Sequence, residues 1–395
     1  MITPIMPTYA RYELTIEQGK GVYVFDTNGN RYLDFGSGIA VASLGHCHPH
    51  LVSALKAQAD TLWHVSNLYN IPTQERLAKR LVSNSFADAV FFNNSGAEAV
   101  EFGFKMIRKY QTAAGFSERY RIISVEGAFH GRSLACLAAG RQKKHLEGFG
   151  PIVDGFDQVP LGSISEMRAA IRPETAGIVI EPVQGESGIR PIDVDYLKEL
   201  RKITKESGIL LMFDEVQCGV GRTGALYAYE HFDTIPDILA SAKGLGGGFP
   251  IGACLASEKV ASVMIAGSHG STFGGNPLAM AVGNAVLDIL LEDGFFDKVS
   301  SVGNYMRSQL HHLVERYDKI LAEVRGIGLM LGLKCLKEGQ NNDLVKAAIK
   351  EGLLTVPAGD NVVRLIPPLI VENNDVDKAV AMIDAACASL ESGNN

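Results

Sequence analysis

The sequence has no apolar run long enough to span a membrane and no excess of positive charge. Its apolar stretches fall short of the roughly 18 uninterrupted residues that a membrane span needs. The net charge of −7 argues against a nucleic-acid or an anionic-membrane partner. The first residues, Met-Ile-Thr-Pro-Ile-Met-Pro, lack the charged-then-apolar pattern of an export signal, so we expect a cytoplasmic protein.

Paired cysteines and a nucleotide-binding P-loop are missing as well. The six cysteines are scattered without a Cys-x-x-Cys pair, which fits free thiols in a reducing compartment. The glycine-rich stretch that begins at Lys243 lacks the Gly-x-x-x-x-Gly-Lys-Ser/Thr spacing of a P-loop. The sequence also contains no linker, low-complexity stretch or internal repeat.

Length and pattern predict an α/β protein with one large and one small domain. The chain has 395 residues, of which 46% are hydrophobic and 21% charged, as in ordinary soluble proteins. Strands and helices alternate from about residue 88 to 256, which predicts a mostly parallel sheet. A hairpin at 21–35 and an α+β segment after residue 325 remain. We therefore predict a large domain over 45–275 and a small domain formed by 1–44 and 276–395.

Two apolar runs that end on a charged residue suggest the chemistry. The run Ile238–Ala242 ends at Lys243, and the run 209–213 ends at Asp214. Burial at a strand end can lower the pKa of a lysine and free its amine as a nucleophile. A lysine that can form an imine and an aspartate that can keep a ring nitrogen protonated are what pyridoxal 5′-phosphate (PLP) chemistry requires from a protein. Alone, however, such a lysine followed by glycines is typical of a flexible loop.

The positions of further polar and aromatic residues support a shared site. Asn94, Phe129, Glu181, Asp214 and Lys243 all fall at the carboxyl ends of predicted strands. In a parallel sheet these ends meet along one edge, where ligands bind. We therefore expect these five residues to lie near one another.

The start of the helix predicted after residue 94 has two interpretations. Ser95 and Glu98 have the spacing of a capping box, in which the serine side chain serves only the helix. A helix N-terminus with Ser95 and Gly96 directly after a strand can equally bind an anion such as phosphate. Both interpretations use the same backbone donors, so they compete.

A histidine cluster at His46, His48 and His50, with Cys47, resembles a metal site at first sight. The residues are crowded on a loop, and the ligand spacings of zinc sites are absent. Pro49 is well placed to begin a helix that runs to about Leu62. We therefore interpret this stretch as a structural loop and predict no metal.

In their order, the motifs resemble those of the class III aminotransferases, the ω-amino-acid transaminases of PLP fold type I, over essentially the whole chain. The segments that carry the resemblance are Tyr32-Leu-Asp-Phe, Gly45-His-x-His-Pro, Asn94-Ser-Gly-Ala-Glu-Ala, Phe129-His-Gly-Arg, Glu181-Pro-Val-Gln-Gly-Glu, Asp214-Glu-Val-Gln, Lys243-Gly, Ser271-Thr-Phe-Gly-Gly-Asn-Pro and Arg364-Leu-x-Pro-Pro-Leu. One departure is Ser187, where the family commonly has glycine. It leaves Glu186 in place.

The resemblance implies a role for each matching residue. Lys243 resembles the lysine that binds the cofactor covalently and moves the proton. Asp214 resembles the aspartate that pairs with the ring nitrogen of the cofactor. The remaining cofactor residues implied are Ser95, Gly96, Ala97, Phe129, Glu215, Val216, Gln217 and Thr272. By the same resemblance, Ser95 to Ala97 bind the phosphate, and Thr272 is supplied to that site by a partner subunit. Val216 and Phe129 cover the two faces of the ring, and Gln217 reaches the ring hydroxyl. The substrate residues implied are Arg132, Glu186, Ser271 and Arg364, with Arg364 binding the α-carboxylate of glutamate and Glu186 pairing with it otherwise.

The resemblance also implies an activity and a homodimer with shared active sites. The segments at Phe129 and Asp214 point to the acetylornithine branch. There the ω-amino group of N-acetyl-L-ornithine passes to 2-oxoglutarate, giving N-acetyl-L-glutamate 5-semialdehyde and L-glutamate in arginine biosynthesis. Succinyl-diaminopimelate, ornithine and γ-aminobutyrate stay open as alternative amino donors. An intramolecular aminomutase, which needs no 2-oxoglutarate, and a nucleotide-binding protein, which would lack cofactor absorbance, are the alternatives outside the transaminases.

Overall fold

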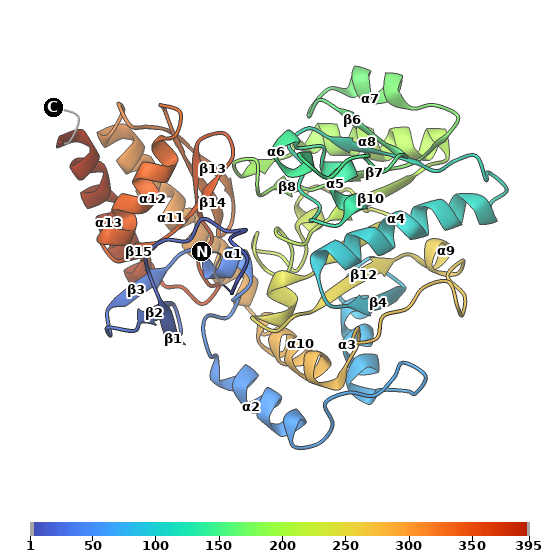
Figure 1. Cartoon of the computed structure of the whole chain (residues 1–395), viewed down its shortest axis with the longest axis horizontal. Helices are drawn as coiled ribbons and strands as arrows, with labels where there is room; N and C mark the ends of the chain where they lie inside the picture. The colour runs from blue at the N-terminus through green and yellow to red at the C-terminus, as the bar shows by residue number, and fades with distance from the viewer. Residues whose placement is uncertain (1–3, 393–395) are drawn as a thin grey trace.

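A seven-stranded sheet forms the core of the larger part of the computed structural model, which describes residues 4–392 (Figure 1). Its strands follow the order β4 (Ala89–Asn93), β12 (Gly252–Ala256), β11 (Ile238–Ser241), β10 (Leu210–Asp214), β7 (Thr175–Ile180), β5 (Arg121–Val125) and β6 (Phe156–Val159). Strand β12 runs antiparallel to both neighbours, and the other pairs are parallel. The expected α/β fold with a mostly parallel sheet is confirmed.

Helices cover both faces of this sheet because its strands are apolar on both sides. In β10, Leu210 and Met212 belong to one buried cluster, and Leu211 and Phe213 belong to another. Helix α4 (Gly96–Ala113) contributes to the first cluster and α8 (Val194–Ser207) to the second. This two-sided burial fixes the sheet edge at which the polar residues collect.

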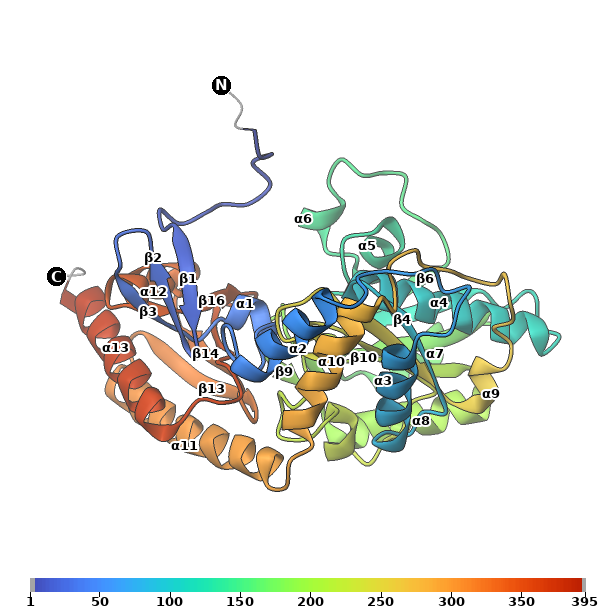
Figure 2. The same cartoon turned by 90° about the horizontal axis from the view of Figure 1, so that it is seen from below.

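The chain ends form the second part of the molecule. The N-terminal strands β1 (Ile16–Lys20), β2 (Tyr23–Asp26) and β3 (Arg31–Asp34) share a sheet with β15 (Leu353–Leu354), so the predicted hairpin is present and pairs with the C-terminal segment. A second sheet has the order β13 (Leu321–Ile327), β14 (Met330–Cys335), β17 (Val362–Leu365), β16 (Val356–Ala358). Figures 1 and 2 show these blue and red segments side by side.

The helices around these sheets complete the fold. Helices α11 (Phe295–Arg316), α12 (Gln340–Lys350) and α13 (Asn373–Ser392) pack with the C-terminal sheets, and α2 (Pro49–Ala59) begins at Pro49 as expected. Helix α10 (Pro277–Leu290) packs against α2 and α3 (Pro72–Ser83). The contacts of the large unit thus reach beyond residue 275, and the domain boundaries at 44/45 and 275/276 stay a prediction. No helix in residues 4–392 combines the length and apolar character of a membrane span.

Candidate active site

Asp214 and Lys243 lie next to each other at the carboxyl edge of the sheet. Asp214 is the last residue of β10, and Lys243 follows β11, whose Ala240 pairs in parallel with Asp214. Lys243 begins the short 3₁₀ helix η2 (Lys243–Gly246) with a φ of 44°, a conformation that is uncommon for a residue with a side chain. The fold therefore brings together the lysine and aspartate on which the sequence argument depends.

The amine of Lys243 is placed to act as a nucleophile. Its Nζ has no hydrogen-bond or ion-pair partner among residues 4–392. Desolvation lowers the pKa of Lys243 to about 8, although the negative charges of Glu186 and Asp214 act in the opposite direction. At pH 7 about a tenth of this amine is therefore unprotonated, far more than for an exposed lysine.

Asp214 is held rigidly by a histidine that the sequence argument did not single out. Nδ1 of His130 lies 2.7 Å from Oδ2 of Asp214, and the Val216 N–H donates to Oδ1 at 3.0 Å. Both side chains are buried. The signal for His130 was its position directly after Phe129 at a strand end, but nothing in the sequence indicated its partner.

The surroundings of His130 favour its charged form. Burial acts to lower the pKa of His130, but the hydrogen bond and charge of Asp214, with the charge of Glu181, outweigh burial and raise it. Its Nε2 is buried without a partner in the described residues. Glu181 directly follows β7 and accepts from the Phe129 N–H at 2.8 Å, which fixes the backbone before His130.

The N-terminus of α4 offers free backbone donors. The Ser95 side chain accepts from the Glu98 N–H at 3.2 Å, as a capping residue does. The Glu98 carboxylate binds the Asn94 N–H instead, at 2.6 Å. Within residues 4–392 the N–H groups of Gly96 and Ala97 have no acceptor, so the cap and an anion site coexist here.

Close packing joins this helix end to the loops after β10 and β5. A Cβ at position 96 would lie 2.5 Å from Cγ1 of Val216, and one at position 131 would lie 2.7 Å from Cβ of Ala97. Glycine at 96 and 131 therefore allows the approach. Val216 and the Phe129 loop thus border the donors of α4, while their places on the two faces of a ring stay a prediction.

Arg132 is a cation beside the ring of Phe129. Its guanidinium lies 5.6 Å from the centre of the Phe129 ring, and Nη2 lies 3.1 Å from Nε2 of His145. The Arg132 side chain is exposed and has no carboxylate partner among residues 4–392. Burial and the charges of Arg132 and Lys144 lower the pKa of His145, which keeps it a neutral acceptor. Arg132 is thus available to bind the carboxylate of a substrate.

Arg364 and Glu186 form a two-pronged ion pair inside the site. Nη1 and Nη2 of Arg364 lie 2.6 and 3.2 Å from the two carboxylate oxygens of Glu186. Nη1 also donates to Oε1 of Gln217 at 3.1 Å. Burial acts to raise the pKa of Glu186, but the charge and hydrogen bond of Arg364 lower it. Gln217, expected at the ring hydroxyl, here supports the Arg364–Glu186 pair.

Glu215, Ser271 and Thr272 are the remaining residues expected at the site, and they differ in burial and contacts. Glu215 is fully buried and accepts from the N–H groups of Ala228 and Tyr229, so its side chain holds the start of the short 3₁₀ helix η1 (Ala228–His231). Ser271 and Thr272 line a cavity of 510 Å³ together with Ala97. Ser271 accepts from Asn94 Nδ2 at 3.2 Å.

The histidine loop has a structural contact of its own. Nε2 of His46 lies 2.7 Å from Oδ2 of Asp34, and Pro49 begins α2 directly after His48. Among residues 4–392, no group of three or more histidine, cysteine or acidic side chains is placed to hold a metal ion.

The residues present fit PLP. The unpaired N–H groups of Gly96 and Ala97 suit a phosphate, the free amine of Lys243 suits the aldehyde, and the buried Asp214–His130 pair suits a protonated ring nitrogen. No one of these three features is diagnostic. Together they suit a phosphorylated aldehyde cofactor.

Comparison with known proteins identifies the class. Residues 6–387 match the family Aminotransferase class-III. The acetylornithine aminotransferase of Brucella melitensis is 54% identical over 393 residues, covering 100% of this chain and 97% of the relative. The chain belongs to the class III aminotransferases. It is therefore a PLP-dependent aminotransferase.

Solved structures agree with this assignment. The ornithine aminotransferase of Toxoplasma gondii, described with partial occupancy of PLP, superposes with a TM-score of 0.94 at 31% identity, covering 99% of this chain and 93% of that one. The N-acetylornithine aminotransferase of Stenotrophomonas maltophilia superposes with a TM-score of 0.86 at 36% identity, covering 98% of both chains.

Proposed function

We propose that the chain transfers the ω-amino group of N-acetyl-L-ornithine to 2-oxoglutarate, giving N-acetyl-L-glutamate 5-semialdehyde and L-glutamate in arginine biosynthesis. The similarity to acetylornithine aminotransferases over the full chain, at 54% identity, carries this choice. The ornithine aminotransferase with the higher TM-score is only 31% identical.

In this proposal the site residues bind, orient and move protons. PLP, when bound, supplies an electrophilic carbonyl carbon and a ring that stores the electron pair released at the substrate carbon. Lys243 Nζ would take the proton from that substrate carbon and deliver it to the former carbonyl carbon of the cofactor. Asp214, charged and paired with His130, would hold the proton on the ring nitrogen. The N–H groups of Gly96 and Ala97 would hold the phosphate.

Two arginines would serve the two substrates. Exposed Arg132 would bind the carboxylate of N-acetylornithine, far from the reacting amine. With this substrate Arg364 has no carboxylate to bind, and Glu186 neutralises it. When glutamate or 2-oxoglutarate enters, its α-carboxylate would replace Glu186 on Arg364. The Arg364–Glu186 pair thus lets one site accept two different molecules.

We also propose that the enzyme is a cytoplasmic homodimer whose subunits complete each other's sites. Trp63, Leu68, Tyr69 and Phe273 are each more than 60% exposed. The segments that carry them lie together, since the rings of His64 and Phe273 are 5.2 Å apart. Residues 4–15, which precede β1, run away from the body (Figure 2). A second copy would cover this apolar surface and could bring Thr272 to the partner's phosphate site.

A substrate panel tests the proposed function. Purified holoenzyme would be assayed with 2-oxoglutarate and N-acetylornithine, succinyl-diaminopimelate, ornithine or γ-aminobutyrate. We expect the highest kcat/KM with N-acetylornithine. A higher value with free ornithine or γ-aminobutyrate would contradict the proposal, and turnover without any amino acceptor would indicate an aminomutase.

A further inference from the structure

Two hairpins carry the two members of the Arg364–Glu186 pair. The first hairpin consists of β8 (Val183–Gln184) and β9 (Arg190–Pro191), and Glu186 lies in its loop. The second consists of β16 and β17, with Arg364 on β17 and a turn at 359–361. The position of one hairpin relative to the other therefore decides how well Glu186 meets Arg364.

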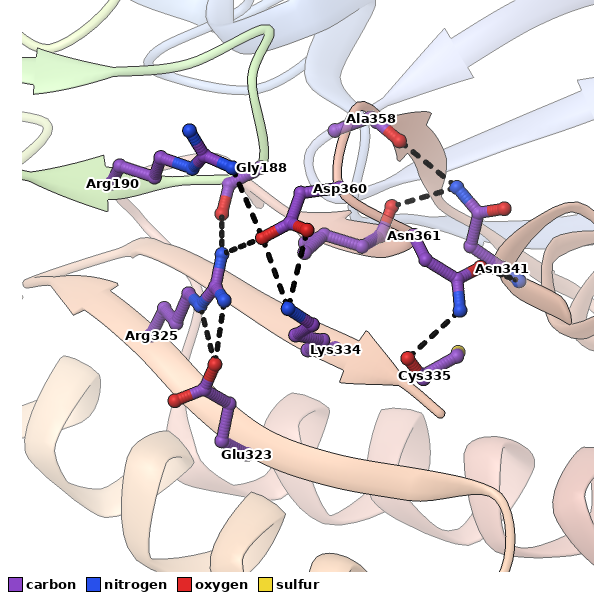
Figure 3. A network of polar contacts seen from close by, with 11 residues as sticks. Gly188, Arg190, Glu323, Arg325, Lys334, Cys335, Asn341, Ala358, Asp360 and Asn361 are labelled. Carbon is purple, nitrogen blue, oxygen red and sulfur yellow. Dashed lines mark hydrogen bonds and ion pairs between the residues drawn. The ribbon is translucent and has the colours of Figure 1, made fainter. Parts of the chain in front are cut away.

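Asp360, in the turn of the second hairpin, joins the two hairpins (Figure 3). Its Oδ2 lies 3.2 Å from Nη2 of Arg190 on β9 and 2.6 Å from Nη1 of Arg325 on β13. Lys334 Nζ on β14 donates to both oxygens, at 3.1 and 3.2 Å. One carboxylate thus binds a cation of the first hairpin and two cations of the C-terminal sheet.

Backbone contacts reinforce this junction next to Glu186. The Gly359 N–H donates to the carbonyl of Glu186 at 2.8 Å, and Arg325 Nη1 donates to the carbonyl of Gly188 at 3.4 Å. Burial alone would raise the pKa of Asp360, but hydrogen bonds from Arg325, Lys334 and Arg190 lower it to about 2. The carboxylate is therefore charged at every pH at which the enzyme would be assayed.

We propose that Asp360 is a positioning residue that sets substrate selectivity by fixing the Glu186 loop against the hairpin of Arg364. This inference rests on the proposed exchange of Glu186 for a substrate carboxylate on Arg364. A loosened loop competes less well for Arg364. The α-carboxylate of glutamate then reaches Arg364 more easily. A donor such as N-acetylornithine places no carboxylate at Arg364 when it binds productively. It therefore meets an unpaired, buried guanidinium, which can bind the donor's distant carboxylate in a non-productive orientation.

The test compares the two half-reactions of the holoenzyme in Asp360→Asn. Asparagine tolerates the φ of 52° at this position and keeps the size of the side chain, so the change removes mainly the charge. We expect the ratio of kcat/KM for N-acetylornithine to kcat/KM for glutamate, from single-turnover spectra, to fall about three- to tenfold. Arg190→Gln removes the link to the first hairpin and should lower the ratio in the same direction.

Glu323→Gln is the matched control. Glu323 contacts Arg325 at 2.6 Å. The substitution therefore removes one charge from the same network but leaves the contacts of Asp360 in place. We expect its selectivity ratio to stay within about twofold of wild type. A wild-type ratio in Asp360→Asn, even with a lower melting temperature, would show a merely structural role and overturn the inference, as would an equal shift in Glu323→Gln.

The preferred amino donor of the wild-type enzyme tests the proposed function, and the change of the selectivity ratio in Asp360→Asn tests the role of Asp360. If the wild-type enzyme prefers another ω-amino donor, the proposed substrate is wrong. The ratio is then formed with that donor and glutamate, because the role of Asp360 requires only that the donor place no carboxylate at Arg364. An unchanged ratio would still overturn the role of Asp360.

Discussion

At the scale of single residues, desolvation decides the protonation of Lys243. Below its pKa of about 8 the amine is charged and cannot attack the cofactor aldehyde, and above it the amine is free. We predict that the rate at which the apoenzyme captures PLP, followed by absorbance, rises with pH through about 8 and then levels off. A rate that keeps rising beyond pH 10, as for an exposed lysine, would contradict the burial argument.

Replacing Lys243 by alanine removes both the covalent anchor and the proton carrier. We predict that turnover is lost while the protein stays folded, because Nζ has no partner in the described residues whose loss would destabilise the fold. Turnover and circular dichroism together check this prediction. A variant that retains the wild-type rate would exclude Lys243 as the catalytic residue.

His130 acts through Asp214. His130→Leu would leave Oδ2 of the buried Asp214 carboxylate without its hydrogen-bond partner, so the carboxylate would be held less firmly toward a ring nitrogen. We predict a fall in kcat of about tenfold, because a small misplacement of a group that holds the cofactor can cost this much in rate. His130→Asn offers an N–H donor of similar reach and should retain more activity. Equal losses in both variants would favour a packing role.

At the scale of elements, the N-terminus of α4 depends on Gly96. Helix propensity alone would favour alanine there, but the added Cβ would meet Val216 at 2.5 Å. We predict that Gly96→Ala raises the dissociation constant of PLP about tenfold, because displacement of either element disturbs the phosphate donors. In a double-mutant cycle Val216→Ala should recover part of this loss, and strict additivity would contradict the account.

The sequence predicted elements well where local chemistry decides them. Pro49 began a helix, Ser95 capped one, and apolar runs ending at Asp214 and Lys243 formed adjacent parallel strands. Contacts between distant segments were not predictable in this way. The bond from His130 to Asp214 spans 84 positions, and the link from Glu186 to Arg364 spans 178. The resemblance supplied the second contact but not the first.

At the scale of the whole molecule, the exposed apolar surface around Trp63 bears on assembly. Trp63 is the only tryptophan and is 65% exposed in the single chain. A homodimer that covers it would shift its fluorescence to shorter wavelengths, and Leu68→Arg would prevent both the shift and dimer formation. Sedimentation with fluorescence detection checks this prediction. A monomer with a water-exposed tryptophan at all concentrations would contradict the proposed dimer.

The central claim is that Lys243 and Asp214 form a PLP site that exchanges an amino group between an ω-amine and 2-oxoglutarate. The most direct measurement adds N-acetylornithine alone to the PLP-loaded enzyme and follows the cofactor spectrum and the semialdehyde. The account predicts one equivalent of semialdehyde per site, conversion of the cofactor to its amine form, and full reversal when 2-oxoglutarate is added. An unchanged spectrum with no semialdehyde, from enzyme that has bound PLP at Lys243, would contradict it.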